Sequence, residues 1–246
     1  MSRVLRCWGM GSTAALIALI ALLAGCTPAP TGLQMFPLDA GRSWTYRLVT
    51  TFDDPSLLPE RETLVLSARG GETLKGEALW RRRSSTGSDY WLRSDDTGIA
   101  RVASQGAMDV EPQADQPARY VLRRPFVVGT EWSATTGSYV YQRRNEFPRE
   151  LRHLKRYQSL PMKYRIEAID VSVQTSAGDF TGCLRVGGRA DIRLYVDELF
   201  TWKDVPMLTR EWYCPGVGLV RVERAEVSPS KFIVGGTLAM ELTAWR

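Results

Sequence analysis

The amino-acid sequence predicts a mainly β protein: an antiparallel barrel, half-barrel or sandwich of about ten to twelve strands, with at most one short helix. Three observations predict this class. Short segments rich in β-branched and aromatic residues recur along the chain, and glycine-containing turns separate them. Apolar and polar residues alternate most clearly in residues 163–169, where Tyr164, Ile166 and Ala168 share one face.

Strand composition covers residues 43–51, 62–68, 90–93, 98–104, 119–122, 131–142, 163–175, 179–186, 190–196, 208–213, 218–227 and 232–242. Tight turns are expected at glycines between them, including Gly70-Gly71, Thr86-Gly87 and Gly187-Gly188. Two longer loops are expected at residues 53–60 and 104–118.

One stretch, residues 147–160, has helical character. Leu151 and Leu154 are its apolar residues. Pro148 can occupy an early helical position, and Pro161 would end the helix. A basic hairpin loop is the alternative for the same residues.

A short pattern occurs twice in the chain. Pro37-Leu38-x-x-Gly41-x-x-Trp44 recurs as Pro125-Phe126-x-x-Gly129-x-x-Trp132. In each copy we expect glycine to permit a tight turn and tryptophan to begin a strand and close one end of the sheet. If the repeat is genuine, the chain would contain two related halves that meet near residues 118–125. The alternative is a chance match.

The first 25 residues have the organisation of a secretory signal. Arg3 and Arg6 make the start positive, and residues 13–24 form an uncharged apolar core that is short for a bilayer span. Leu23-Ala24-Gly25-Cys26 resembles the bacterial lipobox. That resemblance implies cleavage before Cys26 and fatty acyl chains on this cysteine. The alternatives are an ordinary secretory signal or an N-terminal membrane helix that is not cleaved.

Residues 26–35 then form a lipidated tether, because the proline-rich stretch after Cys26 cannot continue a helix. Residues 36–246 form the β-rich domain. Two or more acyl chains anchor a protein stably to a bilayer. Threonine at position 27, in place of aspartate, favours the outer membrane by similarity to enterobacterial sorting rules. We therefore expect a protein of the bacterial cell envelope, lipid-anchored in the outer membrane and facing the periplasm.

Charge excludes little by itself. The leader carries two of the 32 basic residues and none of the 27 acidic ones, so the mature chain has a net charge of +3. This balance does not indicate a nucleic-acid partner, and the compartment also argues against one. Eight tryptophans and nine tyrosines are many for this length. Aromatic residues suit half-buried sheet surfaces and interfaces that are wet on one side.

Two cysteines, Cys183 and Cys214, lie beyond the anchor in the mature chain. The envelope is oxidising, so this pair predicts a disulfide. Closing a loop of about 32 residues would stabilise the fold by about 3–4 kcal/mol. A redox or nucleophilic thiol is the alternative, but the chain has no CxxC spacing.

Residues 178–186 (GDFTGCLRV) and 211–220 (EWYCPGVGLV) resemble a loose group of uncharacterised bacterial envelope lipoproteins with a β-rich domain. The group carries a GxFxxCxxV strand, a YxPGVGxV hairpin and a PLxxGxxWxY opening. The resemblance implies antiparallel β-structure and no particular activity. The opening is matched by Pro37, Leu38, Gly41, Trp44 and Tyr46.

A search for catalytic or cofactor motifs finds none that is specific. His153 is the only histidine, and no GxSxG motif accompanies it. A zinc site would need further histidines or free cysteines. Adjacent acids such as Asp53-Asp54, Asp95-Asp96 and Asp197-Glu198 point to opposite faces of a strand and make poor acid–base pairs. We expect no enzyme activity, no metal and no cofactor.

Basic clusters are the surface feature that points to a ligand. Residues 81–83 and Arg123-Arg124 are two of them. Such cations would contact an anionic membrane or cell-wall polymer, contributing about 1 kcal/mol each. A solvated charged face is the alternative. The segment 147–160 supplies the candidate contact residues, which are Arg149, Arg152, Lys155 and Arg156.

The sequence leaves three functions open. The first is a non-catalytic lipoprotein whose β-domain binds a partner or supports envelope assembly. The second is a carrier or acceptor of lipid or lipoprotein, which requires an open apolar groove. The third is an envelope hydrolase, which requires catalytic groups that converge in a cleft.

Overall fold

The computed structural model describes residues 32–143, 159–196 and 201–246 of the chain. Of the segment 147–160, for which a helix or a hairpin loop is expected, only residues 159 and 160 are described. Leu160 begins a strand. Within the described ranges, no helix is long and apolar enough to cross a membrane.

The described residues form one short helix and fourteen strands. The elements are α1 Gly32–Met35, β1 Ser43–Phe52, β2 Glu60–Leu74, β3 Glu77–Ser84, β4 Asp89–Asp95, β5 Gly98–Gln105, β6 Gln113–Arg123, β7 Glu131–Thr136, β8 Gln142–Arg143, β9 Leu160–Thr175, β10 Gly178–Val196, β11 Thr201–Cys214, β12 Gly218–Glu226, β13 Ile233–Val234 and β14 Gly236–Trp245.

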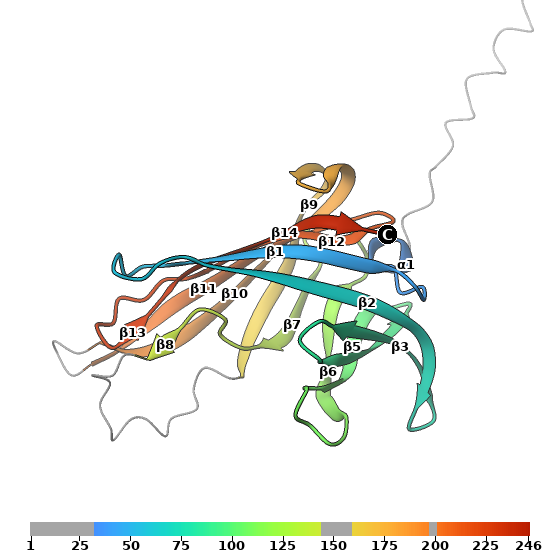
Figure 1. Cartoon of the computed structure of the whole chain (residues 1–246), viewed down its shortest axis with the longest axis horizontal. Helices are drawn as coiled ribbons and strands as arrows, with labels where there is room; N and C mark the ends of the chain where they lie inside the picture. Colours follow the sequence, from blue (N-terminus) through green and yellow to red (C-terminus); the bar gives the residue numbers. More distant parts are fainter. Residues whose placement is uncertain (1–31, 144–158, 197–200) are drawn as a thin grey trace, which may run out of the picture.

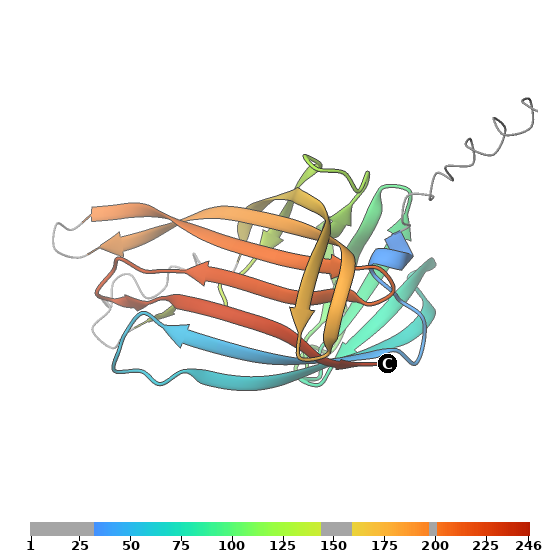
Figure 2. The same ribbon diagram turned by 90° about the horizontal axis from the view of Figure 1, so that it is seen from above.

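Twelve of these strands form one antiparallel sheet that curls into a nearly closed barrel (Figure 1). The order across the sheet is β6-β5-β4-β3-β2-β1-β14-β12-β11-β10-β9-β7. Figure 2 shows the long strands running side by side over one wall of the barrel. Strands β8 and β13 pair separately. The predicted class is confirmed, and the architecture is a barrel.

Alternation in β9 shows how the sequence builds the wall of the barrel. Leu160, Met162, Tyr164 and Ile166 are buried, whereas the residues between them are exposed. Because successive side chains of a strand point to opposite faces, one face of β9 lines the core and the other faces solvent. The alternation predicted for residues 163–169 is therefore confirmed up to Ile166.

Two of the glycine pairs do not form turns. Gly70-Gly71 lies inside β2, and Gly187-Gly188 lies inside β10, which continues for 19 residues. At Gly188, a Cβ atom would lie 2.6 Å from Thr209 Cγ2 and 2.9 Å from Met162 Sδ. Glycine is required there by close approach of the core. Strand β3 was not predicted, because three consecutive arginines hide its alternation.

The two copies of the repeat adopt the same local structure. Gly41 and Gly129 have φ angles of 86° and 96°. Gly41 N donates to Ala68 O at 3.1 Å, and Gly129 N donates to Ile166 O at 2.9 Å. In each copy the tryptophan is the second residue of a strand, β1 or β7, and is buried. The expected turn and strand start occur in both copies.

Apolar side chains pack the interior of the barrel. The largest fully buried ones include Leu38, Ile99, Leu122, Met162, Ile166, Ile192, Leu194 and Met207. A second buried cluster lies beside it and contains Trp44, Tyr46, Val173, Cys183, Cys214, Val217, Val220 and Leu242.

Candidate functional site

Several predicted site residues lie outside the described ranges. These are the lipidation site Cys26, the basic residues Arg149, Arg152, Lys155 and Arg156, and the histidine His153. What was expected of them stays a prediction.

Cys183 of β10 and Cys214 of β11 form a disulfide, with 2.01 Å between the sulfur atoms and 4.1 Å between the Cα atoms. Both cysteines are fully buried. The register pairs Leu184 with Tyr213, so the bond crosslinks neighbouring strands beside the turn between β11 and β12. The predicted disulfide is confirmed.

Two of the three motifs of the sequence resemblance, the opening and the hairpin, lie in contact. The opening segment, Pro37 to Tyr46, lies against the turn that joins β11 and β12. Trp44 Nε1 donates to Val217 O at 2.7 Å. Tyr46 Oη donates to Leu219 O at 2.9 Å. These motifs, more than 170 positions apart in the sequence, are two parts of one structural contact.

We call this end of the barrel the tether end and define it by residues 32–42 and the turn 214–218. Two hydrogen bonds connect its two segments. Gly216 N donates to Gln34 O at 2.8 Å, and the side-chain Nη1 of Arg42 donates to Gly216 O at 2.9 Å. Both backbone groups of Gly216 are thus satisfied by the N-terminal segment.

Arg82 is buried at the tether end without a carboxylate partner among the described residues. Its Cζ lies 3.9 Å from the ring centre of Phe36 and 4.2 Å from that of Trp44. Its Nη2 donates to Pro37 O at 2.7 Å. Burial lowers the pKa of Arg82 to about 10. Aromatic faces and one carbonyl therefore hold this cation inside the protein.

The interpretation of residues 81–83 as one surface cluster is wrong for Arg82. Its neighbours point the other way, as successive residues of a strand must. Arg81 Nη2 lies 2.8 Å from Asp89 Oδ2, and Arg83 Nη1 lies 3.5 Å from the same oxygen. Two of the three arginines are thus paired with one carboxylate, and the third is buried.

A second buried arginine lies at the other end of β12. Arg224 Nε donates to Glu226 Oε1 at 2.5 Å, and Arg224 Nη2 donates to Gly137 O at 2.6 Å. The Glu226 carboxylate accepts from Ser138 Oγ at 2.7 Å and from Val140 N at 2.9 Å. Burial alone would raise the pKa of Glu226, but Arg224 and these hydrogen bonds outweigh it and lower the pKa. The ion pair fastens the loop that follows β7.

A third buried polar group consists of Glu211 and Tyr213 on β11. Tyr213 Oη donates to Glu211 Oε2 at 2.5 Å. Burial raises the pKa of Glu211, although Tyr213, Arg119 and Arg224 act against the shift. Burial also raises the pKa of Tyr164 to about 12. The interior therefore disfavours the charged forms of these acids.

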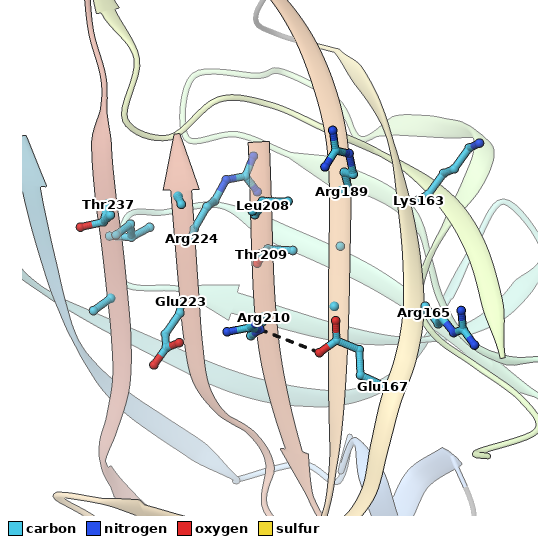
Figure 3. A pocket seen from close by; sticks show the side chains of 15 residues that line it. Lys163, Arg165, Glu167, Arg189, Leu208, Thr209, Arg210, Glu223, Arg224 and Thr237 are labelled. Carbon is cyan, nitrogen blue, oxygen red and sulfur yellow. Dashed lines mark ion pairs between the residues drawn. The ribbon is translucent and has the colours of Figure 1, made fainter. Parts of the chain in front are cut away.

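The outer face of the sheet carries a hollow of about 680 Å³, which we call the outer groove (Figure 3). Strands β9, β10, β11, β12 and β14 form it. Arg165, Gly187, Arg210 and Glu223 lie in one row across four of these strands, because each is the register partner of the next. Gly187 leaves space in that row, and the Glu167 carboxylate occupies part of it.

Four exposed cations surround the outer groove: Lys163, Arg165, Arg189 and Arg210. The fifth basic residue of the lining, Arg224, is buried. Lys163 makes no ion pair with any described residue. Arg210 Nε lies 3.9 Å from Glu167 Oε2, and Figure 3 shows these two side chains facing each other.

The other two cations have partners outside the groove. Arg165 Nη1 lies 3.6 Å from Glu131 Oε1, and Arg189 Nη2 lies 2.8 Å from Asp191 Oδ1. In each of these pairs both side chains are at least half exposed. Exposed pairs of this kind contribute little to stability.

A second hollow of about 590 Å³ adjoins the outer groove and shares Glu223 with it. The tip of the β9–β10 hairpin bounds it, above β14 in Figure 1. Ser176 Oγ donates to Glu241 Oε1 at 2.7 Å, and Ala177 N donates to Leu242 O at 3.2 Å. These bonds hold the tip against β14.

The sequence contained a signal for the outer groove in the spacing of the charged residues of β9. Lys163, Arg165 and Glu167 alternate with the buried residues of β9, so their spacing already placed them on the solvent face. Arg189 stands at an exposed position of β10 in the same way. Which strands lie next to each other depends on the barrel, so the grouping of these cations did not follow from the pattern.

Two solved structures resemble the chain. One is a protein assigned as exported, with a YmcC-like fold, from Bacteroides fragilis; the TM-score is 0.37 at 11% identity, covering 86% of this chain and 98% of that one. The other is assigned as a lipoprotein, from Parabacteroides distasonis; the TM-score is 0.38 at 13% identity, covering 88% and 99%. No protein-family model and no curated protein matches the sequence.

Proposed function

We propose that this protein is a lipoprotein anchored through Cys26 in the outer membrane, facing the periplasm, and that its β-domain binds an anionic polymer of the cell envelope without catalysing a reaction. The observation that carries the proposal is the outer groove with its four surrounding cations. The anchor rests on the lipobox.

The pairing of the groove cations supports an anionic ligand. Lys163 has no ionic partner among the described residues, and the separation of Arg210 from Glu167 is long, at 3.9 Å. The Arg165 pair is exposed on both sides. An incoming anion therefore displaces only weak interactions.

The spacing of the cations supports a ligand with repeated charges. Lys163 and Arg189 are register partners on β9 and β10, and Arg165 follows two residues after Lys163. Neighbouring strands lie about 4.8 Å apart, and same-face residues of one strand lie about 6.7 Å apart. Several charges of one extended chain are thus within reach of the array.

The packed interior favours this function over a lipid carrier. A carrier requires an open apolar cavity, whereas the barrel interior holds a continuous cluster of buried side chains. Charged side chains surround the outer groove, so it is poorly suited to hold the apolar acyl chain that a carrier binds.

A binding measurement tests the groove, with labelled polygalacturonate as the probe. We expect affinity to fall with added salt and to fall about tenfold or more in Lys163→Glu/Arg189→Glu. The control is Arg61→Glu/Lys75→Glu, which makes the same change of charge at exposed positions of β2 and its turn. Equal loss in both variants, or no binding by the unaltered protein, would refute the proposed ligand class.

The anchor has a separate test. Mass spectrometry of the mature N-terminal peptide is expected to show acylated Cys26, and Cys26→Ala is expected to leave an unprocessed or mislocalised precursor. Fractionation of the two membranes then distinguishes the outer membrane from the inner. A cleaved, membrane-retained Cys26→Ala chain would contradict the anchor.

A further inference from the structure

The point at which the chain leaves the folded domain is held in place by packing. Met35 and Leu38 are 0% and 1% exposed. Phe36 N donates to Gly32 O at 2.9 Å, which closes the turn of α1. Arg82 fastens the same segment through Pro37 O. The chain toward Cys26 therefore starts at a defined place on the surface of the barrel.

Apolar side chains are exposed at this end of the molecule. Leu33 of α1 is 41% exposed, and Trp245 at the end of β14 is 42% exposed. Figures 1 and 2 agree that α1 and the last strand end at the same end of the molecule (Figure 1, Figure 2). Tryptophan, like tyrosine, has a polar and an apolar part and is enriched where protein meets the headgroup layer of a bilayer.

Cations lie beside these apolar residues. Arg246 N donates to Ser43 O at 3.0 Å. Because Ser43 follows Arg42 in the sequence, the backbones of Arg246 and Arg42 lie close together. Ala68 N donates to Arg42 O at 2.8 Å, which places exposed Arg69 nearby. Asp39, 3.2 Å from Arg42, is the acidic member of this group. This group of four charged residues, three arginines and Asp39, therefore has a net positive charge.

The length of chain beyond the structure limits how far this end is from the membrane. Five residues separate Cys26 from Gly32. A fully extended chain spans at most about 3.6 Å per residue, so Gly32 lies within about 22 Å of an acylated Cys26. The surface that carries the exit is the part of the barrel that the anchor brings to the bilayer.

We propose that the tether end docks on the surface of an anionic bilayer, with Leu33 and Trp245 in the interfacial layer and Arg42, Arg69 and Arg246 at lipid phosphates. This inference rests on the proposed anchor at Cys26. It adds an orientation: the barrel stands with its tether end on the membrane, and the turn between β1 and β2 points away.

A fluorescence experiment on the full, acylated chain tests the orientation. Vesicles of phosphatidylcholine and phosphatidylglycerol carry the protein, and an environment-sensitive thiol label is placed at Leu33→Cys or at Leu58→Cys. Leu58 is the matched position, since it is 84% exposed and lies in the turn at the opposite end of β1. We expect a blue-shifted emission and loss of iodide quenching at position 33 only. Equal quenching at both positions, or protection at position 58 instead, would overturn the proposal.

A charge variant separates headgroup binding from simple proximity. Arg69→Glu is expected to restore iodide quenching of the label at position 33, whereas Arg61→Glu, on the same strand β2 but eight residues away, leaves the protection unchanged. Protection that survives Arg69→Glu and persists on pure phosphatidylcholine would exclude the anionic contact. Flotation of the vesicles is measured in parallel: protein that does not float reveals failure of the anchor, and protein that floats with both labels quenched reveals failure of the docking alone.

Discussion

The two buried arginines and the cations of the outer groove carry the same charge in opposite surroundings. Arg82 of β3, at the tether end, and Arg224, near the end of β12, are both 5% exposed. Arg165 and Arg189 in the groove have side chains that are each 60% exposed. The buried pair contacts rings, carbonyls or a carboxylate, although Arg82 Nε has no hydrogen-bond partner among the described residues, whereas the groove cations hold weak partners.

This difference separates cations that are packed inside the fold from cations that solvent reaches. A buried charge must be compensated, since leaving it alone inside the protein costs several kcal/mol. An exposed charge is compensated by water, and an exposed ion pair contributes little to stability. Substitutions at the barrel ends should therefore change stability, and substitutions in the groove should change binding.

The largest effect is expected from breaking the buried ion pair. Glu226→Gln leaves Arg224 without its carboxylate and should lower the free energy of unfolding by about 3–5 kcal/mol. The measurement is urea denaturation at pH 7. Glu223→Gln, three residues away on the exposed groove side, is the control and should stay within about 0.5 kcal/mol.

Glu226 also sets a pH dependence. Its pKa is lower in the folded than in the unfolded protein. Its contribution is therefore complete above the unfolded pKa and is lost as pH falls through the folded pKa. The stability difference between the unaltered protein and Glu226→Gln should shrink in that acidic range; a difference independent of pH would contradict the ion-pair account.

The next effect is expected at the tether end. Arg82→Ala removes the contacts with Phe36 and Trp44 and leaves a cavity, and should cost about 3 kcal/mol. Arg193→Ala removes the partner of Asp204 from a pair that is exposed on both sides, and should cost about 1 kcal/mol or less. Thermal unfolding of both variants measures the comparison. Equal losses would show that the burial of Arg82 is not what matters.

The two adjacent glycines of β10 sharpen the contrast between the faces of one strand. Gly188→Ala pushes a methyl group against Thr209 and Met162 and should cost about 1–3 kcal/mol. Gly187→Ala meets only the movable end of Glu167 and should cost less than about 1 kcal/mol. Denaturation midpoints of the two variants provide the test. A larger loss of stability in Gly187→Ala than in Gly188→Ala would contradict the assignment of Gly188 to the packed face.

Glu211 should respond in the opposite sense to Glu226. Burial raises its pKa in the folded protein, so ionisation opposes folding above the unfolded pKa. Glu211→Gln keeps an acceptor for Tyr213 and should raise the melting temperature at pH 7. The gain should disappear below the unfolded pKa, where both side chains are neutral. Calorimetry at several pH values measures it, and a gain that persists in acid would have another cause.

The smallest effect on stability is expected in the groove. Lys163→Ala and Arg189→Ala should each change the free energy of unfolding by less than about 0.5 kcal/mol. Chemical denaturation checks this value. A loss of several kcal/mol would mean that these cations hold the fold together and would remove the distinction between the two regions.

Sequence patterns predicted the class of fold and the local structure of the repeat, because both depend on residues that are close in the chain. They also predicted the disulfide, because a cysteine can form this bond only with another cysteine. Alternation along β9 predicted which of its side chains are buried. The same rules failed at Gly187-Gly188, where glycine is required by packing against β11 and not by a turn. They also failed at Arg82, whose burial depends on two rings supplied by other segments.

The sequence by itself predicted a leader and an anchor at Cys26, and it determined the antiparallel β-class of the domain, since hydrophobic length, motif spacing and alternation are properties of short stretches. Only the tertiary structure decided that the strands form a nearly closed barrel, that the two distant motifs pack together, and that four cations surround one hollow. Those outcomes depend on which strands are neighbours, and strand order is set by the packing of the whole chain.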